Sequence, residues 1–375
     1  MVKERIKSLD VFRGAVMASM ILVENPGCWN AYQPLRHAAQ GARITPTDFI
    51  FPLFIFIMGI AVPLSLSKWR NQEGVAKEVF SRIIRRTIIL FALGTILKIY
   101  SNLVWLKFDL SEFEFSRGMC LGVLQKIAIT YLVTSIIYFK FNTKTIFASV
   151  IILLLGYWAM LTLIPVEGFD PPGFDREHNI VTMVDIKLLG RPTAEGILST
   201  IPTVISGLLG VLTGILIIRP KDKNAKFKIL MLSGLATTAL GLLWGQVFSI
   251  EKDLWTSSYA LYTGGVGLLL MGLFLWIIDI LKFDKWIMPF QVYGANCITV
   301  YFCSHLLAYT LWFSTATLNG QKVSLLEKLM VTIFGRWFKA PFQSPMASLI
   351  FSLAIVLMWF IPLLIMFRKK IIIKI

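Results

Sequence analysis

Apolar runs of about 20 residues recur from one end of the 375-residue chain to the other. Each is long enough to cross about 30 Å of hydrocarbon as an α-helix, and lipid offers the backbone no hydrogen-bond partners outside the helix. We count ten runs, at about 11–29, 48–67, 85–104, 120–139, 145–164, 197–218, 227–248, 258–280, 287–313 and 346–367. The sequence therefore predicts an all-α integral membrane protein of about ten transmembrane helices, with residues 1–375 as a single polytopic domain.

The net charge of +16 does not indicate a nucleic-acid partner, because the cations follow the membrane topology. With ten helices, one side of the bilayer carries roughly twice as many Lys and Arg residues as the other, as the positive-inside rule requires of the cytoplasmic side. The cation-rich segments are 3–7, 68–86, 140–144, 219–228, 282–285 and 368–374. Both termini are therefore predicted to be cytoplasmic, and the segment 30–46 is predicted to face outwards.

Histidine is scarce in this chain, which contains only His37, His178 and His305. His37 precedes the polar segment Thr-Pro-Thr-Asp at 45–48, which opens an apolar span. Imidazole is well suited to proton transfer near neutral pH, so this position favours a catalytic role, with a plain loop histidine at the lipid interface as the alternative. We expect no metal site, because the four cysteines lack the spacing of metal ligands.

Ionisable and polar side chains within membrane spans are costly, so each is a candidate functional residue. From a rise of about 1.5 Å per helical residue, we place eight of them in the outer half of the membrane: Glu24, Asn25, His37, Asp48, Lys126, Trp255, Ser257 and His305. Lys126, with Gln125, is expected about two turns into the fourth span. Such convergence predicts a pocket.

Polar residues in or near the spans also have structural explanations. Asp10 and Arg13, at the start of the first span, can pair on one helix face, and the segment 256–258 can cap a helix. Lys126 can extend towards the membrane surface, and His305 can form a hydrogen bond within the helix bundle.

Several motifs, in order along nearly the whole chain, resemble the heparan-α-glucosaminide N-acetyltransferase family and its bacterial relatives. They lie at 5–14 (RIKSLDVFRG), 25–27 (NPG), 34–38 (PLRHA), 45–52 (TPTDFIFP), 122–128 (GVLQKIA), 195–202 (EGILSTIP), 254–265 (LWTSSYALYTGG) and 293–296 (YGAN). The resemblance implies a membrane acyltransferase that takes acetyl from cytoplasmic acetyl-CoA to an amino-sugar or glycan acceptor outside. It also implies a bacterial cytoplasmic (inner) membrane location and a possible homodimer.

The resemblance implies roles for particular residues. Its critical histidine matches His37, its second-helix aspartate matches Asp48, and the asparagine of its first outward segment matches Asn25. His37 would be base or nucleophile, Asp48 would orient the ring, and Asn25 would donate to the oxyanion. Glu24 is the alternative base.

The remaining polar residues are assigned to the two substrates. On the coenzyme A side we expect Asp10, Arg13, Arg82, Arg85, Arg86, Gln125, Lys126, Tyr293 and Asn296. On the acceptor side we expect Trp255, Thr256, Ser257, Ser258, Tyr262 and His305. Two alternatives stay open: a transporter or flippase of a polar or lipid-linked solute, and an O-acyltransferase acting on cell-envelope glycans.

Overall fold

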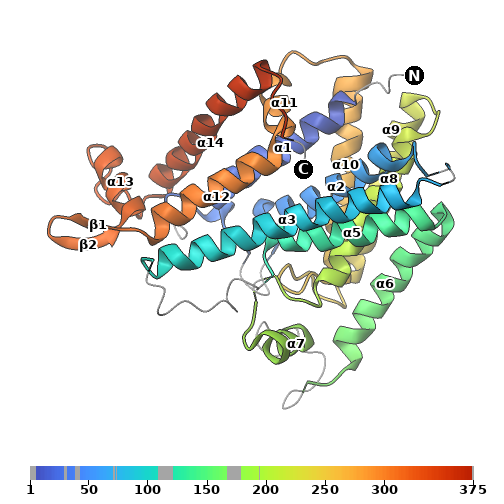
Figure 1. Cartoon of the computed structure of the whole chain (residues 1–375), viewed down its shortest axis with the longest axis horizontal. Helices are drawn as coiled ribbons and strands as arrows, with labels where there is room; N and C mark the ends of the chain where they lie inside the picture. The colour runs from blue at the N-terminus through green and yellow to red at the C-terminus, as the bar shows by residue number, and fades with distance from the viewer. Residues whose placement is uncertain are drawn as a thin grey trace.

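The computed structural model describes residues 6–28, 32–38, 43–70, 72, 74–108, 121–166, 179–193 and 195–373. His178 and parts of the predicted outward segment 30–46 lie outside the described residues. The described chain is built almost wholly of helices (Figure 1), and the all-α prediction is confirmed.

The predicted spans coincide closely with helices. In chain order these are α1 (Lys7–Glu24), α2 (Ile50–Leu66), α3 (Ala76–Trp105), α5 (Val123–Lys140), α6 (Thr143–Leu163), α8 (Thr200–Ile218), α9 (Lys223–Trp244), α10 (Ser257–Phe274, continued by a π-helical turn at Leu275–Ile280), α11 (Met288–Ala295), α12 (Cys297–Phe313) and α14 (Pro345–Arg368). Within the described residues, eight helical segments are long and apolar enough to cross a membrane. Two predicted runs fall outside these eight segments. The helix of the first run, α1, carries several charges, and the ninth run is interrupted at Asn296, between α11 and α12.

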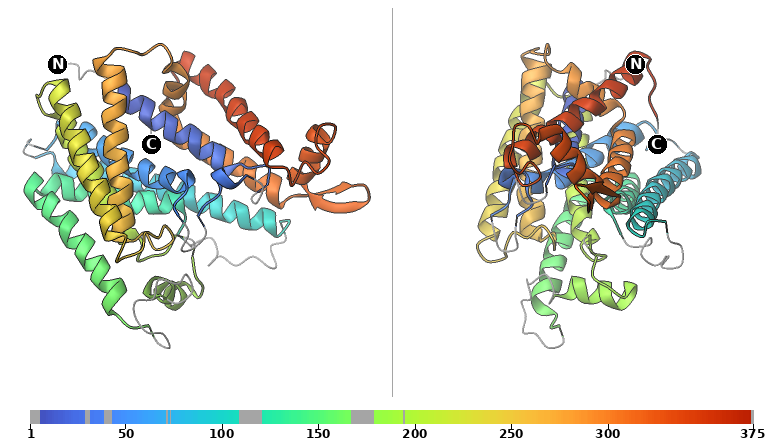
Figure 2. Two further views of the ribbon diagram at one scale, coloured as in Figure 1. Left: turned by 180° about the vertical axis from the view of Figure 1, so that it is seen from behind. Right: turned by 90° about the vertical axis from the view of Figure 1, so that its left-hand side faces the viewer.

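Shorter elements fill the connections. They are the 3₁₀ turns η1 (Gln33–Leu35) and η2 (Pro46–Phe49), helices α7 (Ile180–Leu189) and α13 (Leu325–Phe334), and the antiparallel strands β1 (Thr315–Leu318) and β2 (Gln321–Ser324). The β1–β2 hairpin and α13 project from one end of the molecule, and α7 lies apart from the main bundle, as both Figure 1 and Figure 2 show.

The centre of the bundle is the pair α2 and α8. In their most apolar stretches 72% and 78% of residues are buried, against 17% to 22% in α3, α9 and α14, whose outer faces are left for lipid. Glycines let α2 and α8 touch: a Cβ on Gly59 would lie 2.1 Å from the carbonyl oxygen of Gly207. Close approach through small residues is the usual basis of helix packing in membranes. It fixes α2, and with it the site at its N-terminal end.

Candidate active site

Asp48 organises the turn that leads into α2. Its carboxylate is 0% exposed, and its Oδ2 accepts hydrogen bonds from the backbone N–H groups of Ala38 at 3.1 Å and Thr45 at 3.0 Å. The Thr45 hydroxyl lies within hydrogen-bond distance of both Oδ2 and the Arg36 carbonyl oxygen, and its one proton serves one of them at a time. The Thr-Pro-Thr-Asp segment thus forms a capping box around η2.

His37 is held by the other oxygen of this carboxylate. Its Nδ1 lies 2.9 Å from Asp48 Oδ1, and its side chain remains 41% exposed. The structure therefore joins two residues that the sequence analysis paired. A buried carboxylate behind a partly exposed imidazole is the arrangement that orients a general base.

A third side chain completes this arrangement. Lys252, in the loop between α9 and α10, places its Nζ 2.7 Å from His37 Nδ1 and 3.6 Å from Asp48 Oδ1. His37 and Lys252 face a cavity of about 310 Å³, and Asp48 lies buried behind them. The cavity is lined by His37, Ala38, Phe51, Lys126, Glu195, Lys252, Asp253 and Trp255. Five of these come from α5, the 195 turn and the α9–α10 loop, so the cavity is assembled from distant parts of the chain.

Lys126 forms one wall of the cavity. Its ammonium donates to the Glu195 carbonyl oxygen at 2.6 Å, to Glu195 Oε2 at 3.1 Å and to Ser199 Oγ at 2.9 Å. It also lies 5.0 Å from the centre of the Trp255 ring. The expectation that Lys126 lies two turns into its helix is wrong, because α5 begins only at Val123 and the lysine falls in the first turn. A half-buried carboxylate partner, rather than extension towards water, accommodates its charge.

Trp255 closes the floor of the site. Its backbone lies in the left-handed region, with φ of 51°, which is rare for a bulky residue. Its indole N–H donates to Ser206 Oγ at 3.3 Å, and its ring meets Phe51 and Tyr259 edge-on. Tyr259 in turn donates from its hydroxyl to the Asp48 carbonyl oxygen at 2.5 Å. These contacts tie α10 and α8 to the turn that carries Asp48.

The other residues expected on the acceptor side support this wall. Thr256 caps α10 by accepting from the Tyr259 N–H, while Ser257 and Ser258 donate to the carbonyl oxygens of Leu154 and Ser249. Tyr262 packs edge-on against Phe49. These bonds give each residue a structural function, and acceptor binding by them stays a prediction.

Glu24 and His305 lie in a separate cluster around α12. The His305 ring is buried, with Nδ1 3.0 Å from the Tyr301 carbonyl oxygen. Its centre lies 4.0 Å from the centre of the Tyr301 ring, and the two ring planes are tilted by 34°. Glu24 lies within electrostatic range of His305, Tyr301 and Tyr309. Neither residue lines the His37 cavity.

Asn25 is buried at the C-terminal end of α1, where its Nδ2 donates to the Ile21 carbonyl oxygen at 2.9 Å. It too is absent from the lining of the His37 cavity. The predicted outer-half residues therefore divide into two groups rather than forming one.

The residues expected to hold coenzyme A are spread over several elements. Arg13 pairs with Asp10 at 2.8 Å on α1, and Gln125 Oε1 accepts from the Gly122 N–H beside Lys126. Tyr293 donates to the Val356 carbonyl oxygen, and Asn296 bonds to the backbone of residues 371 and 373. The last two contacts hold the broken α11–α12 segment against α14 and the C-terminal residues.

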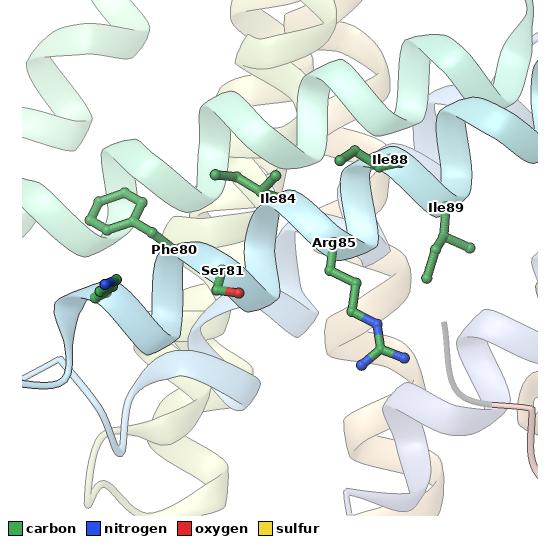
Figure 3. A pocket seen from close by; sticks show the side chains of 7 residues that line it. Phe80, Ser81, Ile84, Arg85, Ile88 and Ile89 are labelled. Carbon is green, nitrogen blue, oxygen red and sulfur yellow. The ribbon is translucent and has the colours of Figure 1, made fainter.

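The three arginines of α3 differ from one another. Arg82 pairs with Glu78 at 2.6 Å, and Arg86 stacks on Tyr131 at 4.6 Å. Arg85 lines a groove of about 580 Å³ (Figure 3) whose lining comes from α3 alone: Lys77, Phe80, Ser81, Ile84, Arg85, Ile88 and Ile89. This groove is larger than the His37 cavity, but it is a mostly apolar face of one exposed helix. The smaller cavity has the groups for chemistry.

Sequence analysis did not identify Lys252 and Glu195 as site residues. Glu195 begins one of the family motifs, but Lys252 stands between Glu251 and Asp253 and reads as an ordinary loop charge. The one sequence feature that could have indicated Lys252 is its position three residues before Trp255, which was itself predicted to belong to the site. Among the described residues, no group of three or more His, Cys, Asp or Glu side chains is arranged to hold a metal ion.

The fold and site together define a multi-pass membrane protein with a histidine–carboxylate pair in a polar cavity. The family model for the catalytic region of heparan-alpha-glucosaminide N-acetyltransferase matches residues 5–242, and the chain belongs to this family. It is 27% identical to the Homo sapiens heparan-alpha-glucosaminide N-acetyltransferase over 79% of this chain and 52% of that protein. It is 24% identical to the Mus musculus protein of that name over 88% of this chain and 58% of that protein. The chain thus spans little more than half the length of these curated relatives.

Proposed function

We propose that the protein transfers acetyl from acetyl-CoA to the amine of a terminal glucosamine or related amino sugar, with the donor arriving from the cytoplasm and the acceptor from outside. The observation that carries the proposal is the His37–Asp48 pair in a polar cavity of a chain belonging to this family. We expect the protein to reside in a bacterial cytoplasmic membrane. The choice of an acetyl group and an amino-sugar acceptor rests on the activity for which the two relatives are named.

The chemistry follows from the needs of an amine nucleophile. An ammonium must lose one proton before its nitrogen can attack the thioester carbonyl; a C–N bond then forms and the C–S bond breaks. The second amine proton is taken up by His37 Nε2 and passes to the departing coenzyme A thiolate, so the net reaction releases one proton. Asp48 holds the Nδ1–H and stabilises the imidazolium. Attack by His37 itself, giving an acetyl-histidine, uses the same residues.

The predicted role of Asn25 as donor to the oxyanion requires its side chain to reorient. Its Nδ2 now donates to the Ile21 carbonyl oxygen, so that donor must turn away from α1 to reach a tetrahedral intermediate. Glu24, the alternative base, would have to act from the neighbouring cluster at α12.

Single-turnover transfer of labelled acetyl in purified detergent-solubilised protein tests the proposal. His37→Ala should fold, bind acetyl-CoA and lose transfer by about 10²-fold or more, while Glu24→Gln should retain most of it. Near-normal transfer by His37→Ala together with loss in Glu24→Gln would assign the base to Glu24. No transfer by the wild type to any amine or hydroxyl acceptor in a panel would contradict the enzyme and favour a transporter.

The sidedness has its own test. A single cysteine in place of the exposed Arg43, in a cysteine-free background, should react with a membrane-impermeant maleimide from the outside of intact cells. Labelling only from the cytoplasmic face would contradict transfer across the membrane, whatever the activity.

A further inference from the structure

The Nδ1 atom of His37 has two neighbours that make opposite demands on it. Asp48 Oδ1 lies 2.9 Å away and Lys252 Nζ lies 2.7 Å away. A carboxylate only accepts hydrogen bonds and an ammonium only donates them, whereas one imidazole nitrogen either carries a proton or presents a lone pair. Nδ1 can therefore satisfy one neighbour at a time, and each neighbour selects a different tautomer of the ring.

The two tautomers differ in their chemistry. When Lys252 donates to Nδ1, the ring proton resides on Nε2, which then has no free lone pair to accept a proton. When Nδ1–H donates to Asp48, Nε2 is free to act as base or nucleophile. The imidazolium formed during transfer also carries a proton on Nδ1, and it would repel an ammonium at 2.7 Å.

Only one of the two neighbours is free to move. The Asp48 carboxylate is 0% exposed and is fixed by the N–H groups of Ala38 and Thr45. The Lys252 side chain is 25% exposed, sits at the edge of the cavity, and is a flexible stem with a compact charge.

We propose that Lys252 is a positioning residue that holds His37 in its non-basic tautomer until an acceptor enters the cavity and draws the lysine ammonium to its own hydroxyl or anionic oxygen atoms. Before the acceptor binds, water in the cavity meets a ring that cannot activate it, so bound acetyl-CoA is protected from hydrolysis. This inference rests on the proposed function for its consequence, but not for the tautomer itself.

The tautomer can be measured without any activity. The chain has three histidines, so ¹⁵N-histidine labelling gives a simple ring spectrum in which His37→Gln assigns the signal. At a pH where the ring is neutral, the wild type should show the proton on Nε2 and Lys252→Met should show it on Nδ1. Lys252→Arg, which keeps a cationic donor, should match the wild type, as should Lys322→Met, which removes an exposed lysine on the β1–β2 hairpin.

A second measurement uses only the wild type. Saturating glucosamine should move the His37 proton from Nε2 to Nδ1. The same tautomer in wild type and Lys252→Met, or a wild-type ring that is unaffected by the acceptor, would overturn the proposal.

Hydrolysis of acetyl-CoA without an acceptor tests the consequence. Lys252→Met should hydrolyse it at least about tenfold faster than the wild type, since a released general base contributes about 10²-fold or more. Adding His37→Ala to this variant should abolish the gain. Slower or unchanged hydrolysis would refute the protective role. Absence of acetyl transfer in every variant would instead refute the proposed function, while the ring spectra would still decide the tautomer.

Discussion

Replacing Asp48 by Asn is the sharpest perturbation of the site, because it changes one carboxylate oxygen to NH₂ with almost no change in shape. Two fixed backbone N–H groups, from Ala38 and Thr45, point at Oδ2, and an NH₂ group there would face them donor to donor. The amide oxygen must therefore occupy the Oδ2 position. The new NH₂ then takes the Oδ1 position, 2.9 Å from His37 Nδ1.

The consequence for the ring is the loss of its basic tautomer. The NH₂ group donates to Nδ1, so the ring proton stays on Nε2 even after an acceptor has drawn Lys252 away, and the base is lost although the histidine remains. A missing or misdirected general base lowers rates by about 10²–10⁴-fold. The site also exchanges charge-assisted hydrogen bonds for neutral ones at a buried position, which lowers the free energy of unfolding by about 1–2 kcal/mol. Activity should thus fall far more than stability.

Single-turnover acetyl transfer and thermal unfolding of the same purified Asp48→Asn preparation separate the two effects. The rate loss should persist in Asp48→Asn/Lys252→Met, because the amide replaces the lysine as donor to Nδ1. Combining Asp48→Asn with His37→Ala should be no worse than His37→Ala alone, since the two residues act as one unit. A rate within about threefold of wild type for Asp48→Asn, when a working tautomer is worth about 10²-fold or more, would refute the reasoning.

The remaining predictions concern packing, the buried charges and the donor. Gly59→Ala should lower the stability by about 1–3 kcal/mol through its clash with α8, whereas Gly156→Ala, with nothing within 4 Å of its Cβ, should not; thermal unfolding in detergent compares them. Lys126→Met should cost about 3 kcal/mol by leaving Glu195 without its buried partner, and Lys126→Met/Glu195→Gln should recover part of the loss in the same assay. Charge reversal of the three α3 arginines, Arg82, Arg85 and Arg86, should weaken acetyl-CoA binding in calorimetry with little effect on acceptor KM. Unchanged acetyl-CoA binding would show that these arginines are not part of the donor site.

Much of the fold could be predicted because lipid imposes a strict rule on the chain. A span must be helical, apolar and about 20 residues long, so most predicted runs match a helix closely. The exceptions are the third run, because α3 begins at Ala76 rather than near residue 85, and the ninth run, which is divided between α11 and α12. The same rule says nothing about short elements outside the bilayer, and helices α7 and α13 and the β1–β2 hairpin were not predicted. The break at Asn296 was not predicted either, because a single polar residue within an apolar run can form hydrogen bonds to a neighbouring helix as easily as it can end its own helix.

Within the site, the local part was predicted and the distant part was not. His37 and Asp48 are 11 residues apart around a turn whose Thr-Pro-Thr-Asp sequence defines its own capping, so their pairing follows from the sequence. Lys252 reaches the same histidine across 215 positions of the chain, and that contact depends on how α10 packs against α2 and how α9 packs against α10. The local sequence around a charged loop residue does not predict which distant side chain it will contact in the folded protein.

The separation of Glu24 and His305 from the His37 cavity has a geometric cause. Counting 1.5 Å of rise per residue gives a side chain's depth in the membrane, and depth is one coordinate of three. Two residues at the same level on different helices can face opposite sides of a bundle. Packing against α2 brings other residues to the histidine: α5, which carries Lys126, contacts α2 directly, and Trp255 meets Phe51 edge-on. Convergence in depth therefore selects the layer in which a membrane site lies, and the helix–helix contacts through residues such as Gly59 decide which members of that layer meet.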